Sequence, residues 1–242
     1  MWGLLGETFR LLAAHASLFT LISLSVWLPG HVLRNYLEFF TPGGSPAESL
    51  RVVLLIQVIF EPLVVSATLI ALDRIKQGAP AGYRVAMAGG LTAWGRLLAT
   101  RLIINCAIAV PAVGGLLIGG PGRLGVVQGA LLLGLAPVVL VLLVRYAVVD
   151  SVVVLGGGNA VTAWRQAALL TSGQRRQILF TAALLFLVIF SFAALCTELF
   201  KLAPALNHFV IRVMVDCVLA VGQSLFTIAL FLFYWRARAA IS

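Results

Sequence analysis

One carboxylate stands in the middle of an apolar stretch that is long enough to cross a bilayer. Glu61 is followed directly by Pro62. An ionised carboxylate at bilayer depth costs about 2.5–3.5 kcal/mol even on lenient insertion scales, so the group must be paired, protonated or in contact with water. Pro62 removes a backbone hydrogen bond and can open a wet cavity beside the carboxylate. The expected polar neighbours are Asn105, Gln57 or Gln223. Glu61 is therefore either a proton or cation site or a hydrogen-bonded carboxyl that joins helices.

A second acidic residue, Asp216, lies nearer the end of an apolar stretch. It follows Arg212 by one helical turn, and this spacing predicts an ion pair at the outer membrane interface. With Glu61, Pro62 and Asn105, Asp216 completes the candidate intramembrane polar site.

Other reactive side chains are scattered. The three histidines fall near the ends of different apolar stretches, and the three cysteines have no paired spacing: His15, His31, His208, Cys106, Cys196 and Cys217. No nucleophile motif or acidic pair accompanies them. We therefore predict a chain that is not an enzyme and has no metal site and no cofactor.

The composition identifies the solvent that surrounds these residues. Of the 242 residues, 62% are hydrophobic and 10% are charged, against about 45–50% and 25% in soluble domains. The mean hydropathy is +1.08. Charged residues enclose six apolar stretches of roughly 21–23 residues, which is the length of a spanning helix. We predict an all-α polytopic membrane protein with spans at about 11–33, 52–72, 102–120, 124–144, 177–197 and 211–235.

The basic residues predict the orientation. With the N-terminus inside, twelve of the 17 Lys and Arg residues fall on the cytoplasmic side. Basic residues in short loops stay in the cytoplasm, so both termini are predicted to lie there, in a bacterial inner membrane with anionic headgroups as partners. The bases are dispersed among apolar residues, a pattern that does not favour nucleic-acid binding.

Two cytoplasmic linkers are predicted to form amphipathic interfacial helices, at about 80–96 and 159–172. Their apolar stripes are Tyr83, Met87, Leu91 and Trp94 in the first, and Val161, Trp164 and Ala168 in the second. Asn159 is a candidate cap and Gly173 a stop signal. The interfacial candidates are Arg84, Trp94, Arg145, Asp150, Trp164 and Arg165. A shift of 81 positions superimposes Tyr83-Arg84 on Trp164-Arg165. This match indicates either a repeat of span, surface helix and span, or the common preference of interfacial helices for an aromatic residue beside an arginine.

Residues 145–173 resemble a segment of the bacterial membrane proteins related to the membrane domain of glycerophosphoryl diester phosphodiesterases. The matching positions are Arg145, Val152 to Leu155, Ala163, Arg165, Leu169 and Gly173. Gly156 or Gly157 stands where the family has an acidic residue. The resemblance implies a six-span architecture, whereas the phosphodiesterase activity of the family belongs to a separate soluble domain.

Two functions fit these observations. The absence of a catalytic constellation in the sequence favours an accessory, scaffold or assembly subunit that binds another membrane protein or a second copy of itself. The alternative is a small transporter or permease-like subunit that moves a small solute, ion or lipid, with Glu61 as its intramembrane polar site.

Overall fold

The computed structural model describes residues 2–40, 46–119, 140–142, 144–158, 160–203 and 207–240, with the backbone alone for 46–54, 105 and 107–119. The elements of this part of the chain are all α-helices, which confirms the predicted all-α class. They are α1 (Trp2–Ala14), α2 (Ala16–Phe40), α3 (Pro46–Lys76), α4 (Tyr83–Gly119), α6 (Val149–Gly156), α7 (Ala160–Leu170), α8 (Arg175–Leu202) and α9 (Phe209–Ala239).

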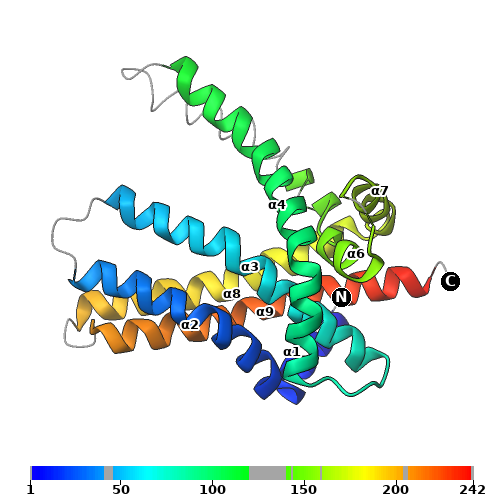
Figure 1. Ribbon diagram of the computed structural model, residues 1–242, viewed down its shortest axis with the longest axis horizontal. Helices are drawn as coiled ribbons and strands as arrows, with labels where there is room; N and C mark the ends of the chain where they lie inside the picture. Colours follow the sequence, from blue (N-terminus) through cyan, green and yellow to red (C-terminus); the bar gives the residue numbers. More distant parts are fainter. Residues whose placement is uncertain are drawn as a thin grey trace.

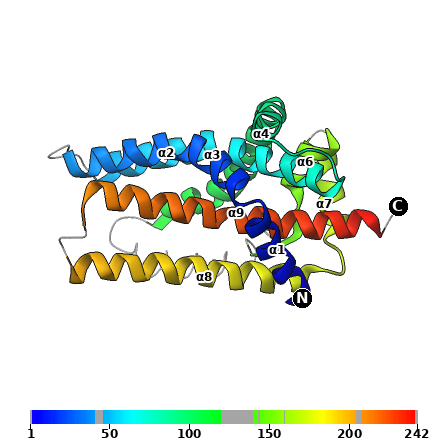
Figure 2. The ribbon, with the colours of Figure 1, turned by 90° about the horizontal axis from the view of Figure 1, so that it is seen from below.

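Four long helices form the body of the protein. Helices α2, α3, α8 and α9 run along its long axis, and α1, α6 and α7 lie at the end where both termini are found (Figure 1). Helix α9 lies between the pair α2 and α3 on one side and α8 on the other (Figure 2), and it contacts all three. Its central position explains why Ile228, Phe231 and Leu232 are at most 1% exposed.

Among the described residues, four segments are long and apolar enough to cross a membrane: Ala16–Phe40, Leu55–Lys76, Arg175–Leu202 and Phe209–Ala239. They correspond to four of the six predicted spans. The predicted span 102–120 falls on α4, whose backbone is helical to Gly119, but most of its side chains lie outside the described residues. The predicted span 124–144 lies almost wholly outside them.

The predicted start of the first span was wrong. Residues 11–14 belong to α1, and the chain turns at His15 before α2 begins at Ala16. Helix α1 packs against α9 and buries Leu4 and Leu5. A short helix held at the bundle end therefore replaces the first turn of the predicted span.

The first predicted interfacial helix is not a separate element. Helix α4 continues from Tyr83 to Gly119, because residues 97–101 contain no proline or glycine that would end it. Of the predicted stripe, Leu91 is 55% exposed and Tyr83 and Met87 are partly buried against the core. Ala86, Ala93 and Leu97, at most 2% exposed, form the buried face. This face of small residues packs against α3, which α4 crosses rather than follows (Figure 1).

The second predicted interfacial helix corresponds to α7, and of its stripe Val161 is exposed and Trp164 is partly buried against the core. Val161 is 62% exposed, while Ala163 and Ala167 are fully buried. Small side chains face the protein because they allow close helix contact, and larger apolar ones such as Val161 point outwards. Gly173 has a φ of 86° in the turn after α7, which confirms it as the stop signal. Asn159, the predicted cap, lies outside the described residues.

Several buried positions recur at the 81-residue spacing of the candidate repeat. Three pairs of residues 81 positions apart are at most 2% exposed in both copies: Ala86 with Ala167, Leu97 with Ile178, and Thr100 with Thr181. A glycine with positive φ precedes the small-residue helix each time, at Gly78 and Gly157. The copies differ in that α4 is continuous, whereas a turn separates α7 from α8.

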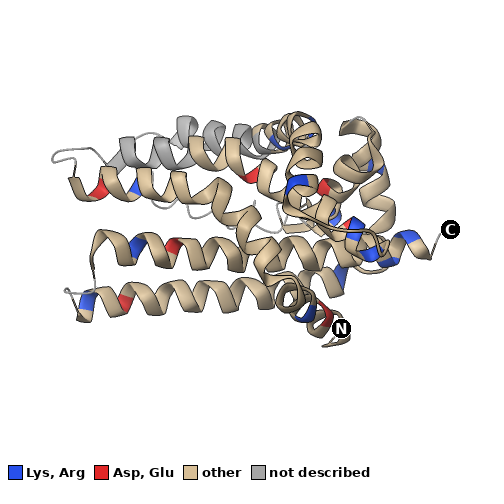
Figure 3. Ribbon diagram, turned by 60° about the horizontal axis from the view of Figure 1, so that its bottom comes forward, with Lys and Arg blue, Asp and Glu red and all other residues tan. Residues whose placement is uncertain are grey.

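Lys and Arg gather toward the end of the bundle that carries both termini (Figure 3). Glu7 of α1 joins three helices there. Its Oε1 accepts a hydrogen bond from Lys76 Nζ of α3 at 2.5 Å, and its Oε2 accepts one from Arg236 Nη2 of α9 at 2.6 Å. Burial raises the pKa of Glu7, but these two hydrogen bonds outweigh it and hold the pKa below its ordinary value of 4.5. The ionised form therefore attaches α1 to the bundle.

Changing Glu7 to Gln is expected to destabilise the folded protein by about 1 kcal/mol at neutral pH, because two charge-assisted hydrogen bonds are weakened at a mostly buried position. A carboxyl with a lowered folded-state pKa stabilises the fold above its unfolded pKa, and this contribution is lost as the pH falls through the lowered value. The difference in unfolding temperature between wild type and Glu7→Gln in detergent should therefore be largest at pH 7 and should disappear in acid. Glu198→Gln is the control, because the Glu198 and Lys201 side chains are 61% and 66% exposed and their loss should change little. A difference that grew in acid would contradict the assignment.

Candidate functional site

Arg101 of α4 lies between two carboxylates from different helices. Its Nη1 is 2.7 Å from Glu61 Oε1 of α3, and its Nη2 donates to Asp150 Oδ2 of α6 at 2.6 Å. Its Nε also points to Asp150 Oδ1, at 3.5 Å. The Arg101 and Asp150 side chains are 21% and 23% exposed, and that of Glu61 is 38% exposed. We call these three residues the ionic triad, which carries one net negative charge when all three are ionised.

Local sequence explains how Glu61 reaches Arg101. Pro62 has no N–H to donate to the carbonyl one turn earlier, so the helix is loosened at this point. The Trp94 indole N–H of α4 donates to the Ile59 carbonyl of the same turn at 2.8 Å. Trp94 was predicted to lie at the membrane interface, whereas it ties α4 to the loosened turn of α3.

Three cavities meet at the triad, because Glu61 and Arg101 line each of them. The first measures about 340 Å³ and also contacts Asp150, Gln57 and Gln223. The second measures about 780 Å³ and extends between α6, α7, α8 and α9 over mainly apolar side chains. The third measures about 290 Å³ and is lined by Pro62 and Gln57. Glu61, Pro62 and the two predicted glutamines are thus brought together, whereas the side chain of Asn105 lies outside the described residues.

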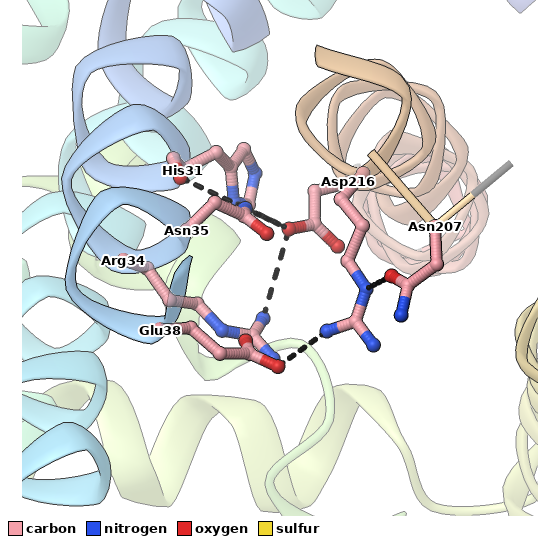
Figure 4. A network of polar contacts seen from close by, with 7 residues as sticks. His31, Arg34, Asn35, Glu38, Asn207 and Asp216 are labelled. Carbon is pink, nitrogen blue, oxygen red and sulfur yellow. Dashed lines mark hydrogen bonds and ion pairs between the residues drawn. The ribbon is translucent and has the colours of Figure 1, made fainter. Parts of the chain in front are cut away.

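Asp216, near the start of α9, is the centre of a second polar cluster (Figure 4). Its Oδ2 accepts a hydrogen bond from Asn35 Nδ2 at 2.8 Å and lies 3.9 Å from both His31 Nδ1 and Arg34 Nη1. All three partners belong to α2.

The predicted pair of Arg212 with Asp216 was wrong. Arg212 Nη1 donates to Glu38 Oε1 of α2, and its Nε donates to Asn207 Oδ1 at 3.0 Å. A base that precedes an acid along a helix is the weaker orientation of an i,i+4 pair, and α2 offers both residues better partners. The Arg212–Glu38 and Asn35–Asp216 contacts therefore connect α2 to α9 rather than stabilise α9 internally.

The two clusters are joined by adjoining cavities. A cavity of about 170 Å³ contacts His31, Arg34 and Asp216. It shares four lining residues with the 340 Å³ cavity: Trp27, Gln57, Ala220 and Gln223. His31 Nε2 is buried and has no hydrogen-bond partner among the described residues. Polar groups therefore line neighbouring cavities between Asp216 and the triad.

The other predicted interfacial residues have separate surroundings. Arg84 and Arg165 are exposed. Arg145 lies 5.7 Å from the centre of the Tyr146 ring, and Tyr146 packs against Trp164 at 5.5 Å between ring centres. Asp150, by contrast, faces Arg101 and a cavity. In the part of the chain that the structure describes, no three His, Cys, Asp or Glu residues come close enough to hold a metal ion.

The sequence analysis missed the role of Arg101. It counted Arg101 as one of the twelve cytoplasmic bases, because it borders the predicted third span. One feature of the sequence could have predicted this role. Glu61 needs a cationic partner within the membrane, and the long side chain of an arginine at the end of a span can extend inwards to provide one. No family model, curated protein or solved structure matches this chain.

Proposed function

We propose that this chain is a small transporter or permease-like subunit that binds its substrate at the ionic triad. The observation that carries the proposal is the convergence of three cavities on Glu61 and Arg101, with a neighbouring cavity that contacts Asp216. Charged groups within membrane segments mark substrate or ion pathways when they face an internal cavity. A polar network that served only to join helices would need no such cavities.

The proposal includes the six-span arrangement in a bacterial inner membrane, with both termini cytoplasmic. It is supported by the four apolar helices and by the meeting of α1 and the ends of α3 and α9 at Glu7. The resemblance to the phosphodiesterase-associated membrane domain remains a prediction about architecture. A common side for both proposed interfacial segments is supported by the buried small residues of α4 and α7, which pack on the protein near the end that carries the termini.

Thiol labelling tests whether the cavities hold water. In a chain with its natural cysteines Cys106, Cys196 and Cys217 replaced by Ala, we expect Gln223→Cys to react with a membrane-impermeant methanethiosulfonate, because the thiolate forms only in water. Leu187→Cys is the control, since Leu187 is 59% exposed on apolar α8 and should face lipid.

A labelling rate at Gln223→Cys about tenfold above the Leu187→Cys control supports a water-filled route, and equal rates would rule it out. The same reagent, added from the cytoplasmic side alone, should modify the introduced cysteine in both Gly82→Cys and Gly156→Cys. Reaction from opposite sides would overturn the proposed topology.

An accessory role is the second candidate, and the surface of α8 favours it. This helix packs mainly against α9, and Phe186, Leu187 and Phe190 are each at least 59% exposed. Such a face suits lipid or another membrane protein. A stoichiometric partner that copurifies in mild detergent would support the accessory role, and a stable lone monomer would count against it.

A further inference from the structure

We infer that the ligand of the ionic triad is a lipid with a primary ammonium head, such as an amine-headed phospholipid of the surrounding bilayer. Its ammonium group lies at Glu61 and Asp150, and a hydrocarbon chain occupies the 780 Å³ cavity. The inference rests on the proposed function, whose substrate class it names.

The charge of the site selects a cation. Among the described residues that line the three cavities at the triad, Glu61 and Asp150 are the acidic groups and Arg101 is the basic one. One negative charge is therefore left over in a mostly apolar setting, where an unpaired charge is costly. An anionic head would face two carboxylates beside the single guanidinium. A ligand ammonium pairs with this leftover charge, and in a zwitterionic phospholipid the phosphate charge lies outside the triad, because two carbons separate it from the ammonium.

The shape of the 780 Å³ cavity favours a ligand with a hydrocarbon chain. From Glu61 and Arg101 it extends past Ile178, Phe186 and Leu230, and its volume is within the usual range for sites that hold an organic ligand. Its wall includes α8, the least covered of the four long helices, so a lipid can enter from the side. A small hydrophilic ammonium ion would leave this apolar part of the cavity unfilled.

An unpaired hydrogen-bond donor in the protein favours a ligand that has a hydrogen-bond acceptor beside its ammonium group. The Trp164 indole N–H belongs to a residue that lines the same cavity, and it is buried without a hydrogen-bond partner among the described residues. Buried donors are normally satisfied. When the Trp164 ring turns its N–H into the cavity, a phosphate or ester oxygen of a phospholipid supplies the missing acceptor, so ammonium, acceptor and chain together describe an amine-headed phospholipid.

Native mass spectrometry tests the inference with the full chain. The protein is reconstituted in vesicles of equal parts phosphatidylethanolamine and phosphatidylglycerol and released in mild detergent, and the retained lipids are identified by mass. We expect phosphatidylethanolamine to be retained in preference. Glu61→Gln and Asp150→Asn should each lower its retention about tenfold, as expected for loss of a buried charge partner, and leave phosphatidylglycerol unchanged. Either variant leaves Arg101 with one carboxylate, so the fold is kept.

Two further variants complete the test. Trp164→Phe removes the N–H donor together with part of the aromatic ring, and should lower retention of phosphatidylethanolamine. Glu38→Gln changes a carboxylate outside these cavities and should have no effect.

The inference is overturned if both lipids are retained equally, or if Glu61→Gln and Asp150→Asn do not change the retention of phosphatidylethanolamine. If Gln223→Cys is labelled but no lipid preference is found, the transport proposal stands and the lipid class is wrong. If Gln223→Cys is not labelled, the transport proposal itself fails.

Discussion

Replacing Arg101 with Met is expected to destabilise the folded protein by about 3 kcal/mol, the largest effect of any single charge removal in the described residues. Arg101 is the counter-ion of both Glu61 and Asp150. Without it, two carboxylates from α3 and α6 face each other across a partly dehydrated cavity, and breaking a buried ion pair from one side leaves the other charge uncompensated. The unfolding temperature of the purified protein in detergent measures the loss.

The triple variant Arg101→Met, Glu61→Gln, Asp150→Asn separates charge from packing. It has no ionised group in the triad, so most of the lost stability should return, because neutral groups of similar volume often replace buried ion pairs at little cost. A triple variant as unstable as Arg101→Met alone would show that the arginine acts through packing instead. Arg34→Met is the matched control, since Arg34 is 43% exposed and 3.9 Å from Asp216 and should contribute about 1 kcal/mol or less.

The triad shows why sequence predicts some members of a site and misses others. Glu61 was predictable because a carboxylate in an apolar stretch violates a strong energetic rule at its own position. Arg101 and Asp150 obey local rules, since each lies at the end of an apolar stretch where charged residues are common. Their roles depend on a contact between residues 49 positions apart, which the sequence pattern of either one does not contain.

The helical class was predictable from composition, because long apolar stretches must satisfy their own backbone hydrogen bonds. The faces of α4 and α7 were not. The predicted stripes of large apolar side chains were assigned to the membrane surface, and no face was assigned to the protein. Ala86, Ala93 and Ala163 are buried against the protein, whereas Leu91 and Val161 are exposed. In a lipid environment large apolar residues have no need to be buried in protein, so hydrophobicity alone does not select the packing face.

Gly90 is the position where this packing is least tolerant, and Gly90→Ala is expected to destabilise the protein by about 1–3 kcal/mol. A Cβ added at Gly90 would lie 2.8 Å from the Cα, Cβ and N atoms of Ala67 in α3. These are mainly backbone atoms, so neither helix can yield by rotating a side chain. The Ser66 hydroxyl also donates to the Gly90 carbonyl at 2.9 Å, and this bond would be stretched if the helices separated.

Gly95→Ala in the same helix is the matched control, because a Cβ at Gly95 would have no neighbour within 4 Å. There the substitution should stabilise α4 by up to about 1 kcal/mol, the usual gain when alanine replaces glycine inside a helix. The same chemical change is therefore expected to shift the unfolding temperature in opposite directions at two positions five residues apart. If both variants were stabilised, the gain in helix propensity would exceed the cost of the steric clash with Ala67, and α4 would not cross α3 at Gly90. Opposite signs would establish the close contact that fixes α4, and with it Arg101, against α3.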